Sequence, residues 1–214
     1  NPDAPDRAKL LYRLKNMVSL PMWLGDVVHR MIERILSDLR NRELSPLESY
    51  QRQSRDILNR EWSQSIEKRW QWKPKYNLNL FEHYYGIDIP AETRVAARDK
   101  VYRCIENFME SSVFRDLGTL RPEAWRSIEK LEQFVVGDWP VFVKLDCAVA
   151  SDGNLTIFDW KTGKESEEPI IQLGCYSLYA FHVWRVPLEN QRLRLFYLDS
   201  GEIRESTVNP SDLI

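Results

Sequence analysis

Apolar positions in the first half of the chain recur at the spacing of α-helices. The clearest stripe lies on one face of a helix that begins near Pro21. It consists of Leu24, Val28, Met31, Ile35 and Leu39. Further helices are predicted from about Ala8, over 47–73, over 90–113, and over 122–134 with Pro122 in the first turn. Residues 1–120 are therefore expected to be mainly helical.

From residue 141 the pattern changes to the alternation of polar and apolar positions that is typical of β-strands. The runs VFVKLDCAVA and NLTIFDWK flank Asp152-Gly153, a pair of residues that favours a tight hairpin turn. A helix from Pro169 to about Val186 and a strand over 192–203, with a turn at Ser200-Gly201, are expected next. The order of elements predicts an α/β fold, in which helices flank a small mixed β-sheet that contains a hairpin.

The predicted hairpin brings like charges together. If Asp152 and Gly153 form a type I′ turn, Asp146 lies opposite Asp159 and Lys144 lies opposite Lys161. Facing carboxylates are destabilising unless a cation stands between them, and Mg²⁺ is typically held by one or two carboxylates. The alternative is a set of Asp–Lys salt bridges across the strands. A metal site is favoured because partly buried ion pairs contribute little net stability.

Composition and charge add two observations. With 214 residues, of which 43% are hydrophobic, the chain can bury a substantial core, and its net charge of −2 gives no overall attraction for nucleic acid. Residues 51–75, however, hold seven Lys or Arg against three Asp or Glu, interleaved with Trp62, Trp70 and Trp72. This segment either faces phosphates or forms a solvated basic face over buried tryptophans.

The cysteines and the hydropathy indicate the compartment. Cys104, Cys147 and Cys175 are widely spaced in apolar contexts, which is typical of reduced core thiols and not of a disulfide framework or a zinc site. No apolar run approaches the roughly 20 residues of a membrane helix. We therefore expect a cytoplasmic protein without a membrane partner.

Four short motifs occur in a meaningful order. Gly25 and His29 stand in WLGDVVH, Asp146 in VFVKLD, the triplet 159–161 in FDWKTGK, and Gln172 with Tyr176 in QLGCY. Together they resemble the RecB-like branch of the PD-(D/E)xK nuclease superfamily, although Lys144 stands where that branch often has glycine. The resemblance implies a single RecB-like nuclease domain over 1–214, with a catalytic α/β core of the restriction-endonuclease type over 121–214 and the helical part as an N-terminal elaboration.

The resemblance also implies roles for individual residues. Asp146, Asp159, the backbone carbonyl of Trp160 and the imidazole of His29 would hold Mg²⁺ or Mn²⁺. Lys161 would orient or deprotonate the attacking water. Gln172 and Tyr176 would present an amide and a phenol to the DNA backbone and to Lys161. Glu132 would be an accessory carboxylate. Apart from the resemblance, helical spacing makes Glu33, at i+4 from His29, one candidate partner for the second nitrogen of a metal-bound imidazole.

The function implied is a metal-dependent DNA nuclease that hydrolyses phosphodiester bonds with a metal-activated water. The alternative is a catalytically inactive module of the same fold that binds DNA or a partner protein. A glycosidase with paired carboxylates would leave the lysine unexplained. Single-stranded DNA or duplex ends are the expected substrates, in repair or defence, and a helicase or other DNA-processing subunit is compatible as a partner. Three cysteines cannot complete the four-cysteine iron–sulfur cluster that some RecB-like proteins carry.

Overall fold

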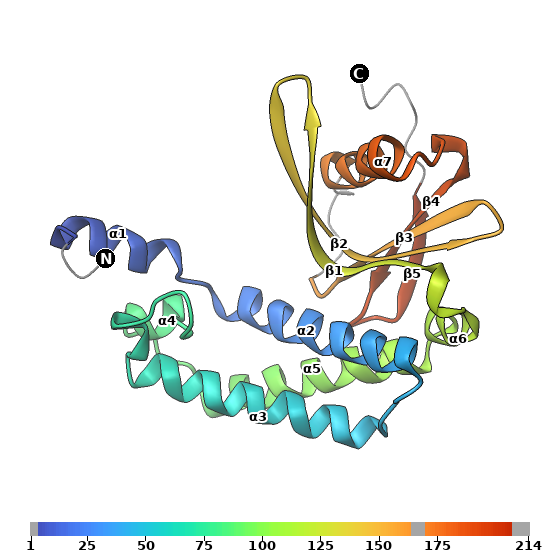
Figure 1. The fold of residues 1–214 in the computed structure, drawn as a ribbon. Helices are drawn as coiled ribbons and strands as arrows, with labels where there is room; N and C mark the ends of the chain where they lie inside the picture. The colour runs from blue at the N-terminus through green and yellow to red at the C-terminus, as the bar shows by residue number, and fades with distance from the viewer. Residues whose placement is uncertain (1–3, 164–169, 207–214) are drawn as a thin grey trace.

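The computed structural model describes residues 4–163 and 170–206 (Figure 1). The helices are α1 (Asp6–Lys15), α2 (Leu20–Asn41), α3 (Leu47–Ile66), α4 (Phe81–Tyr84), α5 (Ala91–Glu110), α6 (Ser112–Thr119) and α7 (Ile170–Trp184). Short 3₁₀ helices are η1 (Arg69–Gln71), η2 (Pro122–Ala124) and η3 (Leu188–Asn190). The strands are β1 (Trp125–Val136), β2 (Trp139–Ser151), β3 (Asn154–Lys161), β4 (Gln191–Tyr197) and β5 (Glu202–Ser206).

The five strands form one mixed sheet in the order β1-β2-β3-β4-β5. All neighbours are antiparallel except β3 and β4, which are parallel and are connected through α7. Parallel neighbours need a crossover of this kind, because a tight turn reverses the chain direction and can therefore join only antiparallel strands. The predicted α/β fold with a small mixed sheet is confirmed.

Each face of the sheet is covered by a different set of helices. Figure 1 shows α2, α3 and α5 as a helical layer on one side and α7 on the other. The first side is packed by the apolar stripe of α2, all of it buried, against Phe158, Trp160 and Phe196 of the sheet. The second is packed by Leu173, Tyr176 and other α7 residues. Strand β3 is therefore buried on both faces, which explains its nearly continuous apolar sequence.

The hairpin between β2 and β3 forms as predicted. Asp152 (φ 51°) and Gly153 (φ 79°) both adopt positive φ, as a type I′ turn requires. The pairs run from Ser151↔Asn154 to Cys147↔Phe158.

Two helix predictions are wrong. Residues 122–134 form η2 followed by the strand β1, and the helix expected over 47–73 ends at Ile66, before η1. In β1 the apolar residues stand at spacings that also fit a helix, but the strand pairs with β2 from a turn at Gly137 (φ 60°) back to Trp125, with interruptions at Glu129 and Arg126. Pairing with β2 overrides the local propensity, which is common for strands.

Two further predictions concern the ends of elements and the membrane. The predicted start of the last helix at Pro169 lies outside the described residues. Within the described ranges, no helix is long and apolar enough to cross a membrane.

Candidate functional site

The end of β3 changes its pairing at Asp146. Asp146 Oδ2 accepts a hydrogen bond of 2.7 Å from the backbone N–H of Trp160, so a side chain occupies the place where the ladder with β2 would continue. Asp159 and Lys161 keep only their pairing with β4, on the other edge of β3, at Leu195 and Tyr197. The described β2–β3 pairs therefore stop one position short of the predicted Asp146–Asp159 pair.

Strand β2 is irregular at the same residue. Leu145 packs on the α7 side of the sheet, whereas Cys147, two residues later, packs on the α2 side, so strict alternation fails across Asp146. In β1 the neighbouring irregularity is Glu129, whose φ is 49°. It lies between the pairs Ile128↔Cys147 and Lys130↔Leu145. A left-handed conformation in a non-glycine residue is costly, and away from turns and helix caps such residues are enriched at functional sites.

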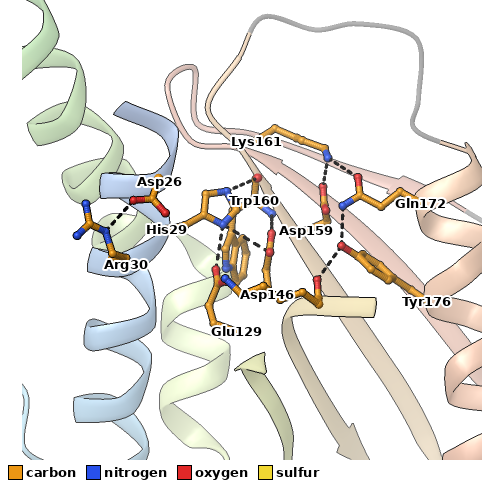
Figure 2. Close-up of polar contacts among 11 residues, drawn as sticks. Asp26, His29, Arg30, Glu129, Asp146, Asp159, Trp160, Lys161, Gln172 and Tyr176 are labelled. Atoms are coloured by element: carbon orange, nitrogen blue, oxygen red, sulfur yellow. Dashed lines mark hydrogen bonds and ion pairs between the residues drawn. The ribbon is translucent and has the colours of Figure 1, made fainter. Parts of the chain in front are cut away.

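His29, from the middle of α2, meets these two carboxylates. Its Nδ1 lies 2.9 Å from Glu129 Oε1 and 3.5 Å from Asp146 Oδ1. Its Nε2 lies 3.1 Å from the carbonyl oxygen of Trp160 (Figure 2). The second nitrogen of His29 thus has Glu129, and not the predicted Glu33, as its partner, because a strand residue on the adjoining sheet points straight at the ring.

Gly25 permits this approach of helix and sheet. It lies one turn before His29, and a Cβ atom there would stand 3.0 Å from Thr162 Oγ1, just after the end of β3. A larger residue would push Thr162 away from α2. The small residue therefore keeps the carbonyl of Trp160 within reach of the imidazole.

Burial and charge fix the protonation states of this cluster. Burial opposes the imidazolium, but the carboxylates of Asp146 and Glu129 outweigh it and raise the pKa of His29 to about 10. Burial likewise opposes ionisation of Glu129, and hydrogen bonds from His29 and Lys144 hold its pKa below the usual range. Lys144 Nζ lies 2.6 Å from Glu129 Oε2, which gives this lysine a structural partner.

A second group of polar contacts surrounds Lys161. Its ammonium lies 2.5 Å from Asp159 Oδ2 and donates to Gln172 Oε1 at 3.1 Å. The amide of Gln172 donates to the hydroxyl of Tyr176 at 2.6 Å, and that hydroxyl donates to the carbonyl oxygen of Lys144 at 2.9 Å. Figure 2 shows this chain leading from β3 across α7 to β2. The structure therefore brings Lys161, Gln172 and Tyr176 together, but Tyr176 is buried and points at the sheet.

The charged form of Asp159 is disfavoured. Burial, and then the charge of Asp146, raise the pKa of Asp159 to about 6, although Lys161 acts in the opposite direction. Keeping both Asp146 and Asp159 ionised therefore costs free energy, and a bound cation would offset that cost.

Glu132 does not join either group. It makes an ion pair of 2.6 Å with Lys130 and lies close enough to Tyr179 of α7 to influence its pKa.

Glu129 is the carboxylate that sequence reasoning missed. In a helix the two glutamates, three residues apart, would share a face, but in a strand they point to opposite faces. The turn at Gly137-Asp138 was the available signal, because counting back along both strands places Glu129 opposite Asp146.

The cluster fits a divalent metal ion. Among the described residues, His29, Glu129 and Asp146 each offer a ligand atom, and these atoms lie within 4.8 Å of one another. Carboxylate and carbonyl oxygens suit Mg²⁺ and Mn²⁺, and imidazole nitrogen is also a ligand for transition metals. The residues present are therefore a suitable set for the ion that the sequence motifs imply.

Comparison with known proteins supports one family. No match was found among the curated proteins with which the sequence was compared. The sequence model of the PD-(D/E)XK nuclease superfamily matches residues 7–212, nearly the whole chain. Since the match includes both groups of polar residues and the mixed sheet that carries them, the chain belongs to the PD-(D/E)XK nuclease superfamily.

Proposed function

We propose that the chain is a DNA nuclease of the RecB-like branch that depends on Mg²⁺ or Mn²⁺ and hydrolyses phosphodiester bonds by attack of water. The observation that carries this proposal is the convergence of His29, Asp146 and the carbonyl of Trp160 beside a lysine, Lys161, that is fixed by two contacts. Membership of the superfamily supports nuclease activity in general. DNA as the substrate is part of the proposal.

Four groups would hold the ion: the imidazole of His29, the carboxylates of Asp146 and Asp159, and the carbonyl oxygen of Trp160. His29 would bind through Nε2, because this nitrogen faces the carbonyl of Trp160. Glu129 would accept the proton of Nδ1 and so orient the ring, as carboxylates commonly do for metal-bound histidines. The ion, when bound, polarises the scissile phosphate and lowers the pKa of a bound water.

Lys161 would place its charge beside the attacking water and the non-bridging phosphate oxygens, where negative charge increases in the transition state. An ammonium has three N–H donors, of which Asp159 and Gln172 account for two. Gln172 would therefore act by positioning Lys161. Tyr176 would fix Gln172 by joining it to the backbone of β2.

Digestion of end-labelled linear DNA and closed circular DNA tests the proposal. Each would be incubated with Mg²⁺, with Mn²⁺ or with EDTA, alongside RNA of the same sequence. We expect cleavage of DNA with either metal and none in EDTA, and loss of cleavage in Asp146→Asn. Asp152→Asn, in the exposed hairpin turn, is the matched control and should cleave normally.

Undiminished cleavage in EDTA, or in Asp146→Asn, would contradict the mechanism. DNA binding without cleavage under every metal condition would support an inactive binding module instead. Cleavage of circles would identify an endonuclease, and release of terminal nucleotides alone would identify an exonuclease.

A further inference from the structure

The end of the helical layer carries a surface that the metal centre does not use. Tyr12 of α1 and residues 72–76, after η1, line an open hollow of about 500 Å³. We call it the aromatic platform; its residues are Tyr12, Trp72, Lys73, Pro74, Lys75 and Tyr76. Figure 1 shows α1 beside the segment that connects α3 to α4, at the opposite end of the helical layer from α6.

The rings of the platform are unusually exposed. Trp72 and Tyr76 are each 77% exposed, and Tyr12 is 47% exposed. Within the described part of the chain, neither Trp72 nor Tyr76 stacks on another ring. Large apolar side chains gathered on a surface in this way indicate a binding site.

The other tryptophans of the basic segment behave differently. Trp70 is buried and packs against Tyr84, with ring centroids 5.5 Å apart. Trp62 contacts Trp23 and lies under the guanidinium of Arg94 at 4.7 Å. The interpretation of this segment as a basic face over buried tryptophans therefore holds in full for Trp70 and in part for Trp62, which is partly buried against the core, whereas Trp72 is exposed.

Backbone contacts hold the platform in place. The guanidinium of Arg13 donates to the carbonyl oxygen of Gln71 at 2.9 and 3.2 Å, which ties α1 to η1. The carbonyl oxygen of Lys73 accepts from the backbone N–H of Tyr76 at 3.0 Å and from Asn77 Nδ2 at 3.1 Å. The exposed rings thus stand on an anchored turn.

The charge of the platform is positive. Residues 68–75, KRWQWKPK, contain four basic residues and no acidic one. Arg69 pairs with Glu67, but among the described residues no carboxylate lies within ion-pair distance of Lys73 or Lys75. Two free ammonium groups therefore flank the exposed rings, which is a favourable arrangement for a polyanion that carries aromatic groups.

We propose that the aromatic platform binds single-stranded nucleic acid, with bases stacked on Trp72 and Tyr76 and phosphates beside Lys73 and Lys75. Exposed aromatic rings within a basic groove are the general means of binding unpaired strands, because every base has a face that can stack. A duplex hides those faces. The inference rests on the proposed function, because it names single-stranded nucleic acid as the form that this nuclease would bind and cut.

The platform is connected to the metal centre through α2. The segment after η1 pairs with Val18, just before α2, through the Val18↔Leu80 bridge, and the backbone N–H of Leu20, the first residue of α2, donates to Glu82 at 3.0 Å. His29 follows nine residues along that helix, about 14 Å at the usual rise of an α-helix. The platform lies beyond the N-terminal end of α2, so a strand held there would remain bound to the chain that carries the centre during successive cuts.

Equilibrium binding without cleavage tests the platform. A labelled oligo-dT and a duplex of the same length would be titrated with the whole chain in EDTA, and fluorescence anisotropy recorded. We expect Trp72→Ala and Tyr76→Ala each to weaken single-strand binding about tenfold, within the range of base–aromatic stacking. Trp139→Ala is the matched control, since Trp139 is also 77% exposed but lies in the β1–β2 turn region.

The lysines have a separate signature. For single strands, the slope of log K against log[salt] changes by about 0.7 for each phosphate contact, so Lys73→Ala with Lys75→Ala should reduce the slope by about 1.4. The same pair of changes should leave the salt dependence of duplex binding nearly unchanged.

Three outcomes would contradict single-strand binding by the platform. They are equal weakening in Trp72→Ala and Trp139→Ala, unchanged affinity in Trp72→Ala, and preferential binding of the chain to anionic lipid vesicles. These outcomes differ from failure of the proposed function. Normal cleavage by the wild type with no effect of Trp72→Ala on binding removes only the platform. Binding that depends on Trp72 in a chain that cuts nothing removes only the nuclease.

Discussion

At the scale of single residues, a change at Lys161 tests whether catalysis can be separated from DNA binding. Its ammonium is fixed by Asp159 and Gln172, and its side chain is only a quarter exposed, at 25%. Lys161→Ala should therefore lower the cleavage rate by about a hundredfold or more, the scale of one group that stabilises a transition state, while DNA affinity in EDTA changes by no more than a few fold. Single-turnover rates and equilibrium binding measure the two effects.

Lys130→Ala is the matched control, since this exposed lysine lies on β1 of the same sheet and pairs only with Glu132 in the described structure. It should leave both measurements unchanged. If affinity and rate fall together in Lys161→Ala, the lysine anchors a phosphate and has no catalytic role.

His29 should link metal affinity to pH. With a pKa of about 10 in the metal-free protein, its ring carries two protons at neutral pH and must release one before Nε2 can bind an ion. Affinity should therefore rise by about tenfold per pH unit between about pH 7 and 8.5. Calorimetric titration in buffers of different ionisation enthalpy would count the released proton.

His29→Ala should weaken metal binding and abolish its pH dependence. His83→Ala, which removes a half-buried histidine hydrogen-bonded to Ser65, should change neither property. Proton release that persists in His29→Ala would place the titrating group elsewhere.

At the scale of elements, Glu61 joins α3 to α2 within the helical layer. It accepts hydrogen bonds from Trp23 Nε1 at 2.8 Å and from two nitrogens of Arg30, at 2.7 and 2.8 Å. Burial opposes its charge, but Arg30 and Trp23 together hold the pKa of Glu61 below its usual range. Glu61→Gln should cost roughly 1–3 kcal/mol of unfolding free energy at pH 7.

The sign of the pH dependence follows from this lowered pKa. A carboxylate that binds its proton more weakly in the folded state adds stability above its unfolded pKa, about 4.3, and loses it as the pH falls through the folded value. Urea unfolding should show the wild type and Glu61→Gln converging in acid. Glu67→Gln, which breaks only the exposed pair with Arg69, should stay within about 0.5 kcal/mol of the wild type at every pH.

The elements differ in how well the sequence predicts them. The β2–β3 hairpin is predicted because its register depends on a local turn, Asp152-Gly153, whose chemistry is specific. The strand β1 is missed because its spacing also fits a helix and its partner lies beyond a second turn. The missed strand explains the missed ligand candidate, since Glu129 reaches His29 only through pairing with β2 and a positive φ.

At the scale of the whole molecule, the candidate centre brings together residues that lie far apart in the sequence. His29 comes from α2, Glu129 and Asp146 from the first hairpin, and Trp160 from β3. The unfolded chain cannot hold these groups together, so an ion binds only the native state. At 100 times its Kd the ion should add about 2.7 kcal/mol, which for a chain of this size raises the Tm by roughly 5–10 °C.

Asp159→Asn should be more stable than the wild type without metal and less stable with it. In the metal-free protein the pKa of Asp159 is raised to about 6, above the unfolded value of about 3.9, so the wild type loses stability as the pH rises through this window. Asn carries no charge, and at pH 8 without metal the variant should melt at a higher temperature than the wild type, an advantage that disappears below about pH 4. With saturating Mn²⁺ the order of the two melting temperatures should invert, because the variant would lack one of the proposed ligands. Thermal melts at pH 4 and 8, with EDTA and with Mn²⁺, measure all the combinations. A variant that is less stable than the wild type in EDTA at pH 8 would show that the Asp159–Lys161 pair stabilises the fold, and the metal would then not be needed to offset a buried charge.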